Sequence, residues 1–529
     1  MFDIIIRNAV IYNGTGTLPL HGDVAVENGK IVGIGNYNSS LAKRIIHADG
    51  RALAPGFIDI HSHYDCAVFG DPILESVLAQ GVTSVISGQC GDSRAPLTDE
   101  MIPDFAEASQ ASCAGAVIDY NWRSFTELLD RFDSMKLGVN LGSLVGHTTV
   151  RRCVLGTENV DPTPTQLERM KSMVSQALEE GALGFSAGLV YLPGMYAKTP
   201  ELAELATCLK PFGLPYMSHI RSEGLFLVEA VQEALDIATY AGVPCHIAHH
   251  KALGRSNWDK VDKTLAIIDA ARAEGMDVTL DLYPYVYSTS TLRAMLPMWA
   301  QEGGIEAANQ RLRDPVIRAK IAAEIEAGQG TNNIWTDAGG AEGVYAMDTG
   351  YTPEYAGLNM LEASRISGKS PIETVLDIIL LNNGWDTGCY CTGFEHNIRR
   401  IMSKPYAMIG SDAVPCAKGA KCNPRTNGTF PRVLSKYVRE ENLFPLEIAI
   451  HKLTGAPATR LKLKSKGFIA VGMDADLVLF DPTTVKDMAT ISDPFQRPVG
   501  IDYVFVNGKC TMENGQYTGV RAGKTIRRA

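Results

Sequence analysis

The chain has 529 residues and a net charge of -10, with 45% hydrophobic and 20% charged residues. This length exceeds that of one simple domain, and the composition is ordinary for a globular protein. The acidic net charge and the lack of a basic stripe argue against a nucleic-acid partner. The sequence contains no run of about 18 apolar residues, so no membrane span is predicted. Residues 1–7 lack the charged leader of a secretion signal. Since the eleven cysteines are scattered, we expect thiols and a cytoplasmic protein.

Short strands and turns are predicted at both ends of the chain. Residues 4–6 and 10–12 are strand-like and lead into the turn signal Asn13-Gly14. Near the other end, residues 475–480 and 503–506 are strand-like. Neither end has enough strands for a stable sheet of its own. We therefore expect residues 1–54 and 465–529 to pair into one small β-domain.

Between the two ends, strand patterns alternate with helix patterns. The candidate strands cover residues 57–63, 82–87, 139–145, 183–187, 215–219, 245–249, 278–283 and 406–411. Candidate helices include residues 165–179, 225–240, 260–274 and 446–453. Eight strand–helix units favour an α/β fold with a closed (β/α)8 TIM-like barrel over residues 55–464. A doubly wound open sheet is the alternative.

The barrel region is long enough to contain an insertion. It spans about 400 residues, compared with about 250 for a plain barrel of this type. Residues 288–344 are the best candidate for the insertion, and residues 317–325 within them have a helical pattern. We expect this segment to form a lid over the mouth of the barrel.

His61-Ser62-His63 closes the first predicted barrel strand. Residues i and i+2 of a strand share one face, so both imidazoles would point into the same cavity. Two neutral histidines on one face are good ligands for a divalent metal. Taken alone, the pair is better explained as polar residues that end a strand at the surface.

The ends of other predicted strands carry further potential ligands. Cys90 follows the second strand, His219 and His249 end the fifth and sixth, and Asp412 follows the eighth. Each has an ordinary alternative: a hydrogen-bonded core histidine, a small buried thiol, or a helix cap. Because the active site of such a barrel lies at the C-terminal ends of its strands, their joint placement indicates a metal centre.

Several segments resemble the N-acyl-D-amino-acid deacylases (D-aminoacylases) of the amidohydrolase superfamily. The matching segments are GFIDIHSHYD at 56–65, SGQCG at 87–91, GHTTVR at 146–151, SAGLVYLPGMYA at 186–197, SHIRSE at 218–223, IAHHK at 247–251, DLYPY at 281–285, IGSDA at 409–413 and NPRTNGTFPRVL at 423–434. GMDADLVLFDP at 472–482 is similar to the β-sandwich signature of the superfamily. The resemblance therefore implies that the terminal β-domain is a β-sandwich.

The resemblance also implies a set of zinc ligands. Dihydroorotases and hydantoinases of this superfamily bridge two metals with a carboxylated lysine from the fourth strand, but 184–188 of this chain contains no lysine. In the deacylases a cysteine after the second strand takes that place, which Cys90 occupies. The implied tight Zn²⁺ site is Cys90, His219 and His249, and the implied second, weaker site is His61, His63, Cys90 and Asp412. The implied substrate-binding residues are Tyr191, Lys251, Tyr283 and Arg425.

The expected reaction is zinc-dependent hydrolysis of a small-molecule N-acyl-D-amino acid to a D-amino acid and a carboxylate. Metal-activated hydroxide would attack the amide, with Asp412 as general base and then general acid. The preference for the D isomer rests on the resemblance alone. A cyclic amide or imide hydrolase (dihydroorotase- or hydantoinase-like) of the same superfamily is the alternative, and a catalytically inactive scaffold is a third hypothesis.

Overall fold

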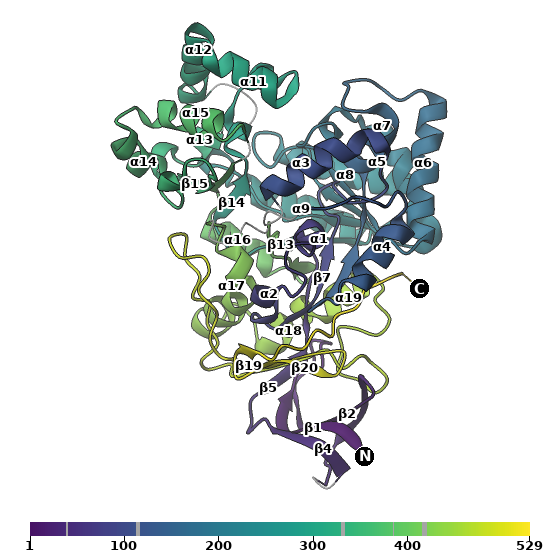
Figure 1. The fold of residues 1–529 in the computed structure, drawn as a ribbon. Helices are drawn as coiled ribbons and strands as arrows, with labels where there is room; N and C mark the ends of the chain where they lie inside the picture. The colour runs from purple at the N-terminus through teal and green to yellow at the C-terminus, as the bar shows by residue number, and fades with distance from the viewer. Residues whose placement is uncertain (39–40, 113–116, 329–333, 385, 415–420, 529) are drawn as a thin grey trace.

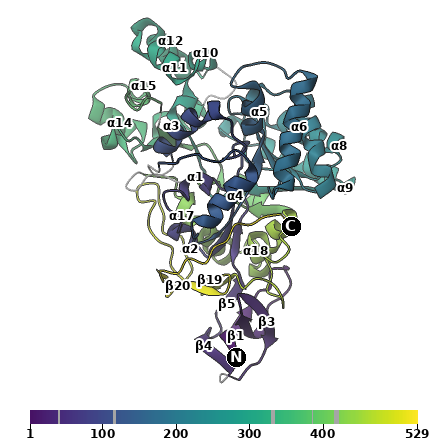
Figure 2. The same cartoon turned by 45° about the vertical axis from the view of Figure 1, so that its right-hand side comes forward.

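The computed structural model describes residues 1–38, 41–112, 117–328, 334–384, 386–414 and 421–528. Three parts are visible in Figure 1: a central α/β region, a β-sheet at the bottom that contains the N-terminus, and a group of helices at the upper left. The same arrangement is seen after rotation in Figure 2. Among the described residues, no helix is long and apolar enough to cross a membrane.

The central region contains a parallel strand at each of the eight predicted positions. These strands are β6 (Phe57–Asp59), β7 (Val82–Ser87), β8 (Asn140–Ser143), β9 (Val145–Gly146), β10 (Phe185–Gly188), β11 (Tyr216–His219), β12 (Cys245–Ile247), β13 (Val278–Leu282) and β17 (Ala407–Ile409). β6, β7 and β8 form one sheet, and β9, β10, β11, β12, β13 and β17 form another. The predicted strand at 139–145 is divided into β8, which pairs with β7, and β9, which pairs with β10.

The two parallel sheets meet at both of their edges. On one side β8 continues directly into β9. On the other side the Asp412 amide donates to the carbonyl of His61 at 2.8 Å, and Ser62 pairs with Ala413 in a parallel bridge. Neighbouring strands in both sheets follow the order of the chain, without the reversal of strand order that a doubly wound sheet would show.

Helices between the parallel strands begin and end where the sequence provides caps. The main ones are α4 (Phe125–Ser134), α5 (His147–Leu155), α6 (Pro164–Glu179), α7 (Thr199–Ala206), α8 (Leu227–Ala241), α9 (Lys260–Ala273), α16 (Glu395–Met402), α18 (Leu446–Leu453) and α19 (Gly455–Arg460). Shorter or irregular ones are α1 (Tyr64–Ala67), α2 (Glu75–Leu78), α3 (Ile102–Ser112) and α17 (Arg425–Arg432). Thr163 and Gln166 form a capping box at the start of α6. Gly242, at φ 65°, ends α8.

The sheet at the bottom of Figure 1 is built from both ends of the chain. Its strands are β1 (Phe2–Ile11), β2 (Leu20–Glu27), β3 (Lys30–Gly35), β4 (Ala42–His47), β5 (Ala52–Pro55), β18 (Leu477–Phe480), β19 (Ile501–Val506), β20 (Lys509–Glu513) and β21 (Gln516–Tyr517). β18 pairs antiparallel with β5, with Val478 opposite Ala54. The N-terminal and C-terminal segments therefore share one nine-stranded sheet.

The helical group at the upper left of Figure 1 has a hydrophobic core of its own. Its helices are α10 (Met298–Gln301), α11 (Gly304–Arg313), α12 (Pro315–Glu326), α13 (Ile334–Asp337), α14 (Met360–Ser367) and α15 (Pro371–Leu381). Its strands β14 (Tyr287–Ser290), β15 (Val344–Asp348) and β16 (Thr387–Cys391) form an antiparallel sheet. The core extends from Leu292 to Tyr390 and so passes well beyond the predicted boundary at residue 344.

Most of the described cysteines are thiols, as expected. Those that form no disulfide are Cys90, Cys153, Cys208, Cys245, Cys389, Cys391, Cys422 and Cys510. Cys66 is disulfide-bonded, so the expectation of thiols throughout is wrong at that position.

Candidate active site

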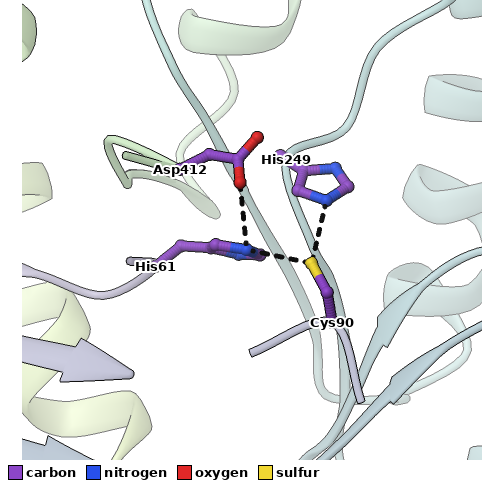
Figure 3. A group of neighbouring side chains, drawn as sticks. All are labelled: His61, Cys90, His249 and Asp412. Carbon is purple, nitrogen blue, oxygen red and sulfur yellow. Dashed lines mark hydrogen bonds and ion pairs between the residues drawn. The ribbon is translucent and has the colours of Figure 1, made fainter. Parts of the chain in front are cut away.

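The ends of five parallel strands bring the predicted ligands together. His61 and His63 follow β6, Cys90 follows β7, His219 is the last residue of β11, and His249 and Asp412 follow β12 and β17. His61, Cys90, His249 and Asp412 point toward a common centre in Figure 3. The predicted strands at 57–63, 245–249 and 406–411 end earlier than expected, so several ligands lie in the loops just beyond the strands.

Cys90 lies between two of the histidines. Its Sγ is 3.3 Å from His61 Nε2 and 3.4 Å from His249 Nε2. Asp412 Oδ1 is 3.7 Å from the same nitrogen of His61. These four residues are buried, and each offers a ligand atom within 4.8 Å of the others. Thiolate sulfur, imidazole nitrogen and carboxylate oxygen are the ligands that zinc prefers.

His219 and His63 complete the cluster. The ring centroid of His219 is 4.3 Å from that of His249, and His219 Nδ1 is buried without a hydrogen-bond partner among the described residues. Such an orphaned nitrogen is costly unless a ligand or metal satisfies it. His63 Nε2 is 3.2 Å from Asp412 Oδ1, and its side chain remains 24% exposed. The residues present therefore fit a bound zinc ion.

Three of these residues have an unusual backbone conformation. Cys90, His249 and Asp412 have φ values of 54°, 34° and 47°. Positive φ in a residue other than glycine costs about 1–3 kcal/mol and is concentrated at functional sites. Gly88 and Gly91 flank Cys90 with φ of 71° and 78°, so the loop depends on glycine around the thiol. The strain supports a functional role for this cluster.

The electrostatic environment keeps two of the donors anionic. Burial alone would raise the pKa of the Cys90 thiol, but the charges of His61 and His249 outweigh it and hold that pKa well below its usual value. Burial would likewise raise the pKa of Asp412, but Arg425 and His249 outweigh it and hold the pKa well below the ordinary range. A thiolate and a carboxylate are therefore available to a cation.

The predicted substrate-binding residues surround the metal cluster. Tyr191, Lys251 and Tyr283, together with His219, His249 and Asp412, line a cavity of about 1960 Å³. Tyr191 is 41% exposed, and its ring centroid is 5.1 Å from that of His219. Residues 288–291 and 293–298 line the same cavity.

Arg425 is buried and contacts two residues that line this cavity. Its guanidinium carbon is 4.4 Å from the centre of the Tyr283 ring, and Nη1 is 2.9 Å from Asp412 Oδ2, an ion-pair contact. Its Nε has no hydrogen-bond partner among the described residues. The guanidinium therefore retains a donor at Nε while Nη1 is paired with Asp412.

Two buried carboxylates were missed as site residues at the sequence level. Glu223 Oε1 is 3.0 Å from His249 Nδ1, and Asp281 Oδ2 is 3.3 Å from His61 Nδ1. Asp281 also accepts from His246 Nε2 at 2.8 Å, so His246 supports the site without joining the ligand cluster. Two features of the sequence could have indicated these carboxylates. Glu223 lies four residues after the strand-end His219, and Asp281 lies inside the apolar strand 278–282.

Comparison with known proteins identifies the class of this chain. It matches the model of the amidohydrolase family over residues 44–512, and it therefore belongs to that family. This confirms the resemblance predicted from its motifs.

Individual relatives cover its full length. The chain is 34% identical over 526 residues to an N-acyl-D-glutamate deacylase of Alcaligenes xylosoxydans xylosoxydans. This alignment covers 99% of this chain and 96% of the relative. It is 32% identical over 527 residues to a D-aminoacylase of the same organism, which covers 100% of this chain and 98% of the relative. Its fold matches a crystal structure of N-acyl-D-glutamate deacylase from Bordetella bronchiseptica, in complex with zinc and a phosphonate mimic of the tetrahedral intermediate. For that structure the TM-score is 0.84 at 30% identity, with 100% of both chains covered.

Proposed function

We propose that this protein hydrolyses N-acyl-D-amino acids to a D-amino acid and a carboxylate. The observation that carries the proposal is the position of Cys90, whose sulfur lies 3.3 Å from His61 and 3.4 Å from His249 at the ends of different strands. Full-length similarity to a D-aminoacylase and to an N-acyl-D-glutamate deacylase supports the substrate class.

The cofactor of this reaction is zinc. Cys90, His219 and His249 would hold the tight site, and His61, His63, Cys90 and Asp412 would hold a second, weaker one. When bound, zinc supplies Lewis acidity, which lowers the pKa of a coordinated water from about 15.7 to about 7.

Asp412 carries the proton in this mechanism. Its carboxylate is ionised and lies among the ligands, so it can take the proton of the attacking water as a general base. It then returns that proton to the departing nitrogen, because an amine leaves readily only when protonated. One carboxylate thus serves both steps.

The cavity residues hold the substrate in place. Arg425 pairs with Asp412 through Nη1 and keeps an unpartnered Nε, and its forked guanidinium suits the carboxylate of an N-acyl amino acid. Tyr191, Lys251 and Tyr283 line the cavity. Fixing the carboxylate and the amide together would decide which stereoisomer presents its amide to Asp412.

The fold supports this assignment at the domain level. We propose that the parallel strands close into a (β/α)8 barrel within residues 55–464, because Asp412 and Ala413 bond to the segment after β6. Residues 1–54 and 465–529 form the terminal β-domain of sandwich type. The insertion, extended to residues 287–391 on the evidence of its separate core, acts as the lid.

The cyclic amide hydrolase alternative has less support. It calls for a bridging lysine on the fourth strand, and β10 has the sequence Phe-Ser-Ala-Gly. Cys90 already supplies an anionic donor next to both histidines.

A substrate screen tests the proposed function directly. The zinc-loaded protein is assayed for release of free amine from paired N-acetyl-D- and N-acetyl-L-amino acids, and separately for ring opening of dihydrouracil and hydantoin to their N-carbamoyl acids, which is followed by chromatography because it releases no amine. We expect turnover of D isomers only. Turnover of the cyclic amides without the D isomers would overturn the proposal.

A further inference from the structure

We infer that Glu223 is a positioning residue that presents His249 and His219 to the zinc ion. This inference rests on the proposed zinc site. Glu223 lies four residues beyond His219, and its side chain is only 6% exposed. Oε1 is 3.0 Å from His249 Nδ1, and Oε2 is 3.7 Å from His219 Nε2. One carboxylate therefore faces the outer nitrogens of both histidines.

The contact with His249 determines which ring nitrogen carries the proton. A neutral imidazole has one N–H donor and one acceptor nitrogen. An ionised carboxylate can only accept, so Glu223 places the proton on Nδ1. This leaves the lone pair on Nε2, which faces Cys90 Sγ at 3.4 Å. The nitrogen directed toward the cluster is then the one able to bind a metal.

Lys251 could oppose this arrangement but has other acceptors. Its Nζ is 2.9 Å from His249 Nδ1, and an ammonium bonded there would force the proton onto Nε2. The same Nζ lies 2.5 Å from Glu223 Oε1 and 3.0 Å from the His249 carbonyl. Lys251 therefore has acceptors for its protons, and it compensates the charge of the buried Glu223 carboxylate.

His219 is oriented in the opposite sense. Its Nε2 faces Glu223, while its Nδ1 is the buried nitrogen without a partner among the described residues. His219 would therefore bind through Nδ1 and His249 through Nε2. An outer carboxylate that fixes the orientation and tautomer of metal-binding histidines raises metal affinity, typically by about 10–100-fold.

The experiment replaces the carboxylate with its isosteric amide in the full-length protein. Glu223→Gln keeps the shape but adds an NH2 donor, so it no longer selects the Nδ1–H tautomer. The zinc dissociation constant is measured by competition with a chromophoric chelator, and we expect it to rise by about 10–100-fold. The cobalt-substituted protein is expected to show an altered visible spectrum, which a purely structural role would leave unchanged.

Glu233→Gln is the matched control. Glu233 lines the same cavity and is bonded to Arg221 at 2.8 Å, and no described contact joins it to His219 or His249. We expect its zinc affinity and cobalt spectrum to match the wild type. If Glu223→Gln fails to fold, Glu223→Asp retains the charge on a shorter side chain and should bind zinc several-fold more weakly.

The outcomes separate this inference from the proposed function. Wild-type zinc affinity in Glu223→Gln, or in Glu223→Asp where that variant is used, overturns the inference. An equal loss in the Glu233 control also overturns it, because the effect would then be one of general charge. A wild-type protein that binds no zinc instead overturns the proposed function.

Discussion

The metal cluster and the ion pairs around Lys466 in the terminal region differ in how fully their buried polar atoms are satisfied. Lys466 is 9% exposed and bonds to Asp476 at 2.6 Å and Asp474 at 3.1 Å, so its charge is compensated. In the cluster, Arg425 is likewise paired with Asp412 at 2.9 Å, but Arg425 Nε and His219 Nδ1 are buried without hydrogen-bond partners among the described residues. The cluster therefore compensates its charges and still leaves buried polar atoms for a ligand.

Backbone conformation shows the same contrast. In the terminal sheet, the residues other than glycine with positive φ are Asn8, Asn28, Asp49, Asn507 and Asn514, and all but Asn8 are followed by glycine. Asparagine and aspartate adopt this conformation at low cost. In the cluster, Cys90 adopts it in the turn Gln89–Asp92, where the Asp92 amide donates to the Gln89 carbonyl at 3.1 Å, and Asp412 adopts it just beyond β17. Cysteine has no such tolerance, so the strain at Cys90 is a cost of function.

The largest effect is expected for Asp412→Asn. The amide keeps the size of the side chain but cannot take a proton, so kcat should fall by about 10²–10⁴-fold. Bound zinc, measured by atomic emission, should remain near the wild-type level, because the proposed tight site does not include Asp412. Near-normal kcat in this variant would exclude Asp412 as the base.

Cys90→Ser is expected to have the second-largest effect, on zinc affinity. Cys90 contacts His61 and His249 and belongs to both proposed zinc sites, and a hydroxyl is a much poorer anion than a thiol. We expect the zinc dissociation constant to rise by more than about 100-fold, beyond the effect of an outer partner such as Glu223. Cys245→Ser is the control, since Cys245 is buried in β12 and donates to the Ala234 carbonyl, away from the cluster. Equal affinities in the two variants would remove Cys90 from the site.

The sequence predicts elements well where a repeating pattern defines them. The predicted helices at 165–179 and 446–453 match α6 and α18 to within one residue, because each has an apolar stripe and a clear start. It predicts the ends of strands poorly at the site. His249 lies beyond β12 because its φ of 34° ends the strand, and no local pattern encodes that turn.

Partners across the cluster could not be predicted for a similar reason. Glu223 and Asp281 act on histidines brought close by the fold, and Asp281 is 220 positions from His61 in the chain. Periodicity carries no information about such contacts. The pairing of β14 with β16 (Thr387–Cys391) is equally distant in the chain, because a long helical segment separates the two strands.

In the terminal region, Lys466→Met should lower stability and leave catalysis unchanged. The substitution leaves the buried Asp476 and the partly buried Asp474 without this cation. Breaking a buried ion pair from one side typically costs about 3–5 kcal/mol. The unfolding temperature should therefore fall, while kcat and zinc content stay at wild-type values. A fall in kcat at temperatures where the variant is folded would contradict the separation of the two regions.

Asp474→Asn should have the smallest effect, and one that depends on pH. Burial alone would raise the pKa of Asp474, but Lys466 and the bond from Lys30 at 2.7 Å outweigh it and lower that pKa from 3.8 to about 2. Because the folded pKa is depressed, the stabilisation is present above pH 3.8 and is lost as the pH falls toward 2. We expect about 1 kcal/mol at neutral pH, since Asp474 is partly solvated. Thermal unfolding of wild type and variant should thus differ at about pH 7 and converge only as the pH falls toward about 2. A difference that stays constant over this range would mean that the carboxylate charge of Asp474 is not what stabilises the terminal sheet.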